Sequence, residues 1–193
     1  MASKKSAPKS PSGPPPSDRS LMKAHESFRD GNYTGALVIA NQILARDPGN
    51  TDALILASQC HSLQGRYDRA VAFDRRAVEL HPQNPQAWMT LALDLGNLGD
   101  LEAAEEAYHR TVGLDPKRGS AWYRLACIAA RRGGLDEALE DLERACAAQP
   151  EYREEAKSQP EFASVLEDPR FTRIVEGDKG SDDPYAEWMR SKT

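Results

Sequence analysis

Prolines recur at a fixed interval of 34 residues along the central part of this chain. They are Pro48, Pro82, Pro116 and Pro150. A proline cannot continue a helix, and it pushes the residue before it out of the α region, so each one ends a helical segment. A period of this length is typical of architectures built from stacked, similar units. The interval therefore predicts four repeated units between about residues 18 and 150.

Each unit contains two segments with apolar residues at helical spacing, separated by a short break at a glycine. In the first unit the helical pattern begins at Asp18 and resumes at Tyr33. In the other three units the predicted helices are 51–64, 67–80, 85–98, 101–114, 119–132 and 135–148. Each unit is therefore expected to be a hairpin of two antiparallel helices.

The charge of the chain limits the partners that it can have. The net charge is −5, and the repeated region is itself mildly acidic. This argues against a broad phosphate-binding surface, so we expect no nucleic-acid partner. No apolar stretch is long enough to span a bilayer, and no apolar segment follows the N-terminal lysines. We therefore expect no membrane insertion and a cytoplasmic location.

The three cysteines, Cys60, Cys127 and Cys146, are odd in number and form no CxxC pair. All three lie inside helical patterns, where cysteine behaves as a small apolar residue. We expect reduced thiols in the core, in line with a reducing compartment.

Both ends of the chain depart from the repeats. Residues 1–17 are rich in proline, serine and lysine, and are expected to form a disordered tail. A docking segment or a basic tail that contacts an acidic partner is the alternative. Residues 151–176 contain three short helical patterns, 151–157, 160–166 and 169–175, which are expected to cap the array; a separate binding element is the alternative. Residues 177–193 are expected to be a mobile acidic tail with an apolar patch formed by Tyr185, Trp188 and Met189.

When each proline is placed at position 32, residue types coincide in columns across the units. Small residues occupy positions 8 and 20, where two helices of a hairpin approach closely, and glycine occupies position 15, at the turn. Large residues occupy most of positions 4, 7 and 17. The small pairs are Ala24 and Ala36, Ser58 and Ala70, Ala92 and Ala104, and Ala126 and Ala138; the glycines are Gly31, Gly65, Gly99 and Gly133.

This pattern resembles the tetratricopeptide repeat (TPR) family over about 134 residues. The resemblance implies an all-α fold, a right-handed α-solenoid of four antiparallel helical hairpins with a C-terminal helical cap. The repeats would span about 17–50, 51–84, 85–118 and 119–150. Position 24 departs from uniformity: Ala40 and Asp74 stand where the later units have Tyr108 and Leu142. We expect the second interface between units to be looser for this reason.

The family's geometry implies that the first helix of each hairpin lines a concave groove. The matching positions are mostly apolar and include two methionines, with arginines toward the fourth unit. This favours a peptide with apolar anchors, with an acid toward the fourth unit; packing against the chain's own C-terminal segments is the alternative. The groove residues are Leu21, Met22, His25, Ile55, Gln59, Met89, Leu93, Asn97, Tyr123, Arg124, Cys127 and Arg131.

Some TPR domains bind the acidic C-terminus of a chaperone through a clamp of lysine and asparagine. The matching positions here are Leu21, His25, Gln59, Gln86 and Thr90, so the Hsp90-type clamp is not present.

The sequence contains no recognisable catalytic motif. The four histidines stand at different repeat positions, and no zinc-site spacing, phosphate-binding loop or nucleophile motif occurs. We expect no metal, no cofactor and no enzymatic activity. The sequence favours an interaction adaptor or scaffold that binds a protein or peptide in the groove. The alternative is a regulatory or assembly factor whose C-terminal tail occupies the groove or docks a partner.

Overall fold

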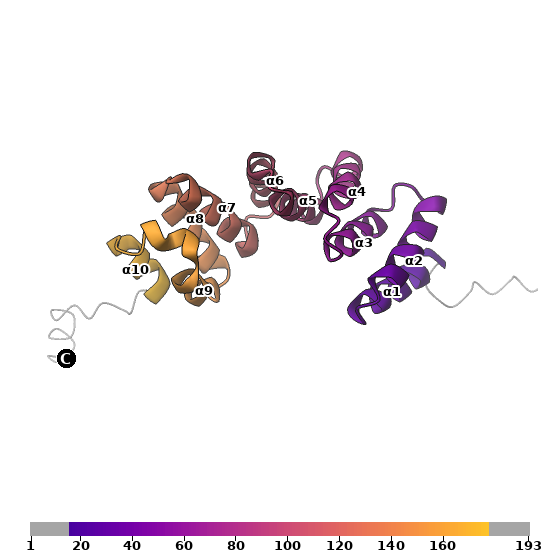
Figure 1. The fold of residues 1–193 in the computed structure, drawn as a ribbon, viewed down its shortest axis with the longest axis horizontal. Helices are drawn as coiled ribbons and strands as arrows, with labels where there is room; N and C mark the ends of the chain where they lie inside the picture. Colours follow the sequence, from indigo (N-terminus) through magenta and orange to yellow (C-terminus); the bar gives the residue numbers. More distant parts are fainter. Residues whose placement is uncertain (1–15, 178–193) are drawn as a thin grey trace, which may run out of the picture.

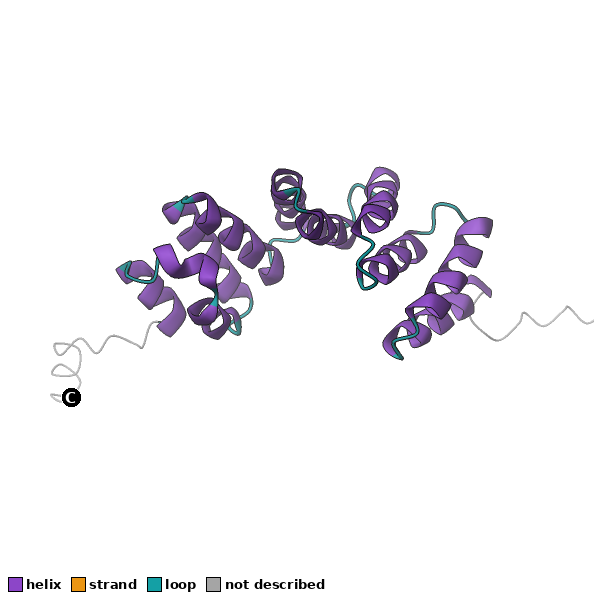
Figure 2. Cartoon of the chain, in the orientation of Figure 1, coloured by secondary structure: helices purple, strands orange, loops and turns teal. Residues whose placement is uncertain are grey.

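A computed structural model describes residues 16–177, which form ten α-helices, one 3₁₀ helix and no strand (Figures 1 and 2). The chain is an all-α solenoid, as expected. Its elements are α1 (Pro16–Arg29), α2 (Tyr33–Arg46), α3 (Thr51–Ser62), α4 (Tyr67–Leu80), α5 (Pro85–Leu98), α6 (Leu101–Leu114), α7 (Gly119–Arg132), α8 (Leu135–Ala148), α9 (Tyr152–Ser158), η1 (Pro160–Ser164) and α10 (Pro169–Glu176).

The first eight helices pair into four hairpins that stack in chain order into an arch (Figure 1). The most extensive contacts are within hairpins, and each second helix also contacts the first helix of the next hairpin. Helix α3 additionally contacts both α1 and α5. In a curved stack, elements on the inner side approach one another most closely, which places the odd-numbered helices on the concave side.

The columns of small residues explain how closely the paired helices pack. All eight predicted residues at positions 8 and 20 are fully buried. The turn glycines also behave alike, since all four have positive φ. Gly99 and Gly133 end α5 and α7 in the left-handed conformation, and their amides bond back to carbonyls of the last turn. The glycine column therefore ends the first helix of each hairpin.

The repeated prolines join successive repeats through their carbonyl groups. The indole of Trp88 donates to the carbonyl of Pro82 at 2.8 Å, and Trp122 donates to Pro116 at 2.9 Å. The first proline loop is bonded from further along the chain, because Arg76 donates to the carbonyl of Pro48 at 2.7 Å. These bonds fix how one hairpin leads into the next.

The largest differences from the predicted helix bounds lie in three elements. Helix α1 begins at Pro16, two residues before Asp18, and proline is favoured in a first helical turn. Helix α3 ends at Ser62, because Gln64 and Gly65 form tighter i→i+3 bonds. The expected helix 160–166 is a 3₁₀ helix that ends at Ser164.

The prediction that the interface between the second and third repeats is looser than the others is wrong. Helices α4 and α5 contact each other as extensively as α2 and α3, whereas α6 and α7 contact each other less. Asp74 is fully buried at this interface, beside Ser58 and Asp94. The more open junction lies between the third and fourth repeats.

The C-terminal elements pack on the last hairpin and form a second hydrophobic cluster with it. Within them, Phe162 and Val165 of the segment around η1, and Phe171 of α10, are buried. Leu166, the last residue of the expected helix 160–166, is 45% exposed. Ring contacts link this cap to α7, since Tyr152 stacks on Tyr123 with ring centroids 4.4 Å apart.

No helix among the described residues is long and apolar enough to cross a membrane. The predictions for the two tails, 1–17 and 177–193, fall outside the described residues except at positions 16, 17 and 177.

Candidate functional site

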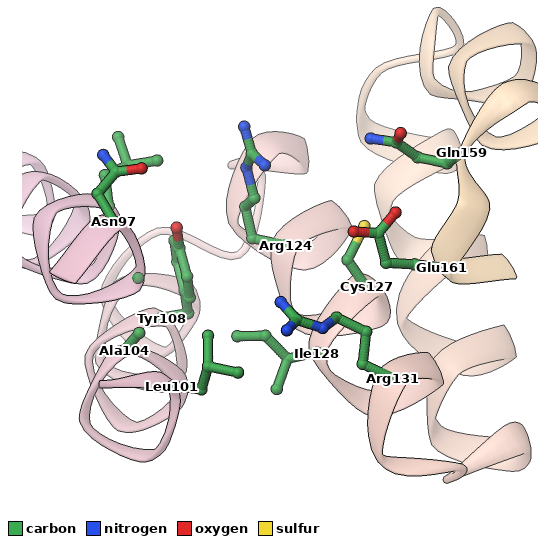
Figure 3. Close-up of a pocket in the computed structure, with 12 residues that line it drawn as sticks. Asn97, Leu101, Ala104, Tyr108, Arg124, Cys127, Ile128, Arg131, Gln159 and Glu161 are labelled. Carbon is green, nitrogen blue, oxygen red and sulfur yellow. The ribbon is translucent and has the colours of Figure 1, made fainter. Parts of the chain in front are cut away.

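A hollow of about 250 Å³ opens on the concave side where the third and fourth repeats meet (Figure 3). One wall comes from α5 and α6, the opposite wall from α7, and the C-terminal cap closes one side. Its volume suits one or two side chains, since pockets for whole small-molecule ligands are roughly 300–1,000 Å³. The residues that line it are Leu93, Gly96, Asn97, Leu101, Ala104, Tyr108, Arg124, Cys127, Ile128, Arg131, Gln159 and Glu161.

Two arginines give the hollow its positive charge. Arg124 and Arg131 are seven residues apart on α7, which is two helical turns and the same face. Figure 3 shows Arg124 near the level of the Asn97 amide and the Tyr108 hydroxyl, while Arg131 lies beside Ile128. Both are exposed, and no ion pair or hydrogen bond to either side chain occurs among residues 16–177. The arginines can therefore donate to a ligand.

Burial sets the protonation of two other lining residues. It raises the pKa of the Tyr108 hydroxyl to about 12, an effect that the nearby Arg124 partly opposes. Burial, reinforced by the Glu161 carboxylate, raises the pKa of the Cys127 thiol to about 12. Both groups are neutral at pH 7, so Tyr108 can donate a hydrogen bond and Cys127 is not an activated nucleophile.

Five of the twelve predicted groove residues meet in this hollow: Leu93, Asn97, Arg124, Cys127 and Arg131. Seven further residues that were not predicted for the groove also line the hollow: Gly96, Leu101, Ala104, Tyr108, Ile128, Gln159 and Glu161. Tyr108 lies on α6, the second helix of its hairpin, and its repeat position (24) predicts packing between units only. Gln159 and Glu161 lie after the last repeat, where no repeat position could assign them to the groove.

The other seven predicted residues lie on α1, α3, α5 and α7. Leu21, Met22 and His25 lie on α1 and are exposed or half-buried, and Gln59 on α3 is half-buried. Ile55 and Met89 are buried between helices. These residues do not share the hollow with the arginines.

Tyr123 is the predicted groove residue whose surroundings differ most from the expectation. Only 1% of it is exposed, because Tyr152 stacks on one side and the Phe162 ring meets it edge-on at 5.9 Å. At this position the chain therefore packs against its own C-terminal segments, which was the alternative to an open groove. The cap covers this end of the concave side and leaves the arginine hollow beside it.

Among residues 16–177, one group of side chains could hold a metal ion. The ligand atoms of Glu105, His109 and Glu137 lie within 4.8 Å of one another. The Arg132 guanidinium bonds both Glu105 oxygens, at 2.9 and 3.0 Å, and also pairs with Glu137. Both carboxylates already pair with the Arg132 guanidinium, so we interpret the group as an ion-pair cluster that joins α6, α7 and α8.

The chain is similar in fold to several solved structures. The chain is similar to MamA, with a TM-score of 0.69 at 18% identity, over 88% of this chain and 97% of MamA. It is similar to YrrB, described as a TPR protein with an unusual peptide-binding site, with a TM-score of 0.66 at 18% identity, over 89% and 90% of the two chains. The first TPR domain of Spaghetti (RPAP3), solved with an HSP90 peptide, has a TM-score of 0.59 at 20% identity, over 61% and 93%. These similarities show the fold.

Sequence comparison gives a consistent result. A probable UDP-N-acetylglucosamine–peptide N-acetylglucosaminyltransferase, SEC, of Arabidopsis thaliana is 29% identical over 91 residues. That stretch is 47% of this chain, which spans only 9% of the length of this curated relative. Two family models, each described as tetratricopeptide repeat, match residues 27–93 and 89–153. The chain belongs to the tetratricopeptide repeat family.

Proposed function

We propose that this protein is an interaction adaptor that binds a segment of a partner protein along its concave side. The observation that carries the proposal is the hollow between the third and fourth repeats. The hollow lies on the same side as the predicted groove. It combines apolar walls with hydrogen-bond donors, and it has the volume of one or two side chains. A site of that size suits an anchor residue of a longer bound segment.

Exposed apolar residues nearer the N-terminal end support an extended site. Met22 on α1 is 59% exposed, and Leu63, directly after α3, is 56% exposed. Both stand at repeat positions that face the groove in this family. Exposed apolar groups that line up along one side of a repeat array often mark a binding surface.

The structural relatives agree with a binding role. YrrB is described as having a peptide-binding site, and the RPAP3 domain was solved with an HSP90 peptide. The Hsp90-type clamp is not present here, so a different peptide is proposed for this chain. We further propose that the protein acts in the cytoplasm by binding, without catalysis and without nucleic acid.

Substitution of exposed groove residues tests the proposal. A tagged full-length chain carrying Met22→Glu and Leu63→Glu should lose the partners that the unmodified chain captures, as measured by quantitative mass spectrometry. The matched control carries Val38→Glu and Leu80→Glu, at residues of the second helices that are 52% and 48% exposed. Equal capture by both variants, with circular dichroism unchanged, would rule out the groove.

The regulatory alternative concerns residues 177–193, which lie beyond the described cap except for Gly177. Deleting residues 178–193 separates the two roles. Under the adaptor proposal, partner affinity stays within about twofold. A large gain in affinity on deletion would favour the regulatory role, because it would mean that the tail competes for the groove.

A further inference from the structure

We propose that the hollow between the third and fourth repeats receives one aspartate or glutamate side chain of the bound partner segment, next to an aliphatic residue. This inference rests on the proposed function, because it names the chemistry of the partner at the same site. It is argued from the charge, the donors and the walls of the hollow.

The charge of the hollow matches a single carboxylate. Arg124, Arg131 and Glu161 are its charged lining residues, and together they leave one net positive charge. One carboxylate neutralises that charge, whereas a phosphate group of nearly two negative charges would exceed it and would face Glu161. The balance therefore favours an acidic side chain over a phosphorylated one.

Arg124 and Arg131 differ from the other arginines of the last hairpin, which form ion pairs. Arg132 pairs with Glu105 and Glu137, and Arg144 pairs with Asp141 at 2.8 Å. Arg124 and Arg131 have no such partner among the described residues, and both border a hollow. A guanidinium group with free donors binds a carboxylate in a fixed, often bidentate geometry.

Neutral donors and apolar walls complete the site. The Asn97 amide and the Tyr108 hydroxyl lie across the hollow from α7 (Figure 3). Leu93, Leu101 and Ile128 supply apolar surface around them. This apolar surface offers contact to an aliphatic neighbour of the acid, and it strengthens the charged hydrogen bonds once the bound segment covers the hollow.

Peptide selection on the full-length chain provides the test. A phage-displayed library of random peptides is selected against the unmodified chain and against a variant carrying Arg124→Gln and Arg131→Gln. The expected result is that peptides from the unmodified chain share an aspartate or glutamate beside an aliphatic residue, and that those from the variant do not. The matched control carries Arg75→Gln and Arg110→Gln, two exposed residues of α4 and α6.

Calorimetry with the best selected peptide then measures the role of the acid. Replacing its acid by the corresponding amide should weaken binding about ten- to a hundredfold, the usual loss for a hydrogen-bonded charged group. The same replacement should have little effect on the double arginine variant. An amide peptide that binds as well as the acid would overturn the inference, and so would a phosphoserine peptide that binds more tightly.

Three further outcomes show whether this inference, the proposed function or both fail. Peptides that depend on Met22 and Leu63 but not on an acid would overturn the carboxylate assignment alone. Peptides insensitive to every groove substitution would overturn both. A tenfold gain in peptide affinity on deleting residues 178–193 would assign the hollow to the chain's own tail and overturn the assignment to a partner.

Discussion

The Ser58 hydroxyl lies 3.1 Å from Oδ2 of Asp94, and this bond links α3 to α5 across the interface of the second and third repeats. Asp74 of α4 lies beside them and is fully buried. Neither of its carboxyl oxygens has a hydrogen-bond partner of good geometry, although Ser58, Thr90 and Asp94 are near enough to influence its charge. Two carboxyl groups therefore share one buried polar cluster.

This cluster predicts a stability that falls as pH rises. Burial, with a smaller contribution from the Asp94 carboxylate, raises the pKa of Asp74 to about 8. The unfolded chain releases this proton near pH 4, so between about pH 4 and pH 8 the folded state holds more protons. The contribution of Asp74 to stability is thus present below about pH 4 and lost as pH rises to about 8. Melting temperatures across this range measure it.

Replacing Asp74 isolates the effect. Leu142 occupies the equivalent position in the fourth repeat and is fully buried, so Asp74→Leu introduces a side chain that this position accepts. We expect a gain of about 1–3 kcal/mol at pH 8, the usual cost of an unsatisfied buried polar group, and a smaller gain near pH 4. Glu79→Leu, on the exposed end of the same helix, is the control. An identical gain at both pH values would contradict the assignment.

The position of each helix could be predicted because the repeat supplies local signals. From α4 to α8 the helices begin and end at the expected residues, where a proline, a glycine or a capping side chain sets each boundary. The groove was less predictable. Tyr123 stands at a groove position, yet Tyr152 and Phe162 cover it, and both lie after the last repeat. Contacts made by non-repeating residues depend on the folded path of the chain, which periodicity does not encode.

The cap should contribute strongly to stability through Phe162. This side chain is fully buried between the Tyr123 and Phe171 rings, with centroid distances of 5.9 and 6.1 Å. Phe162→Ala should cost about 3–5 kcal/mol, because it leaves a cavity at the end of the array. Leu166→Ala, at a residue 45% exposed in the same segment, should cost far less. Urea denaturation compares the two; equal losses would contradict the packing described for the cap.

Replacing Gly99 and Gly113 by alanine should change the stability of the chain in opposite directions. Gly99 has φ of +93°, so alanine there should cost about 1–2 kcal/mol, although nothing lies within 4 Å of the added methyl group. Gly113 lies inside α6 with open space around it, so alanine there should stabilise by about 0.5–1 kcal/mol. Thermal unfolding of both variants checks the pair. A stabilising Gly99→Ala would mean that the turn does not require the left-handed conformation.

Thiol reactivity should report the integrity of the cap. All three cysteines are free and buried, and burial raises the pKa of Cys60 to about 11 and that of Cys127 to about 12. Because the thiolate is the reactive form, labelling by a disulfide reagent at pH 8 should be slow in the folded chain and rapid in denaturant. Cys127 lies beside the cap, at Glu161, whereas Cys60 lies in the second repeat. Phe162→Ala should therefore accelerate labelling of Cys127 while Cys60 stays protected, as resolved by peptide mass spectrometry. Equal acceleration at both sites would indicate that the whole array opens together and that the cap does not protect Cys127 locally.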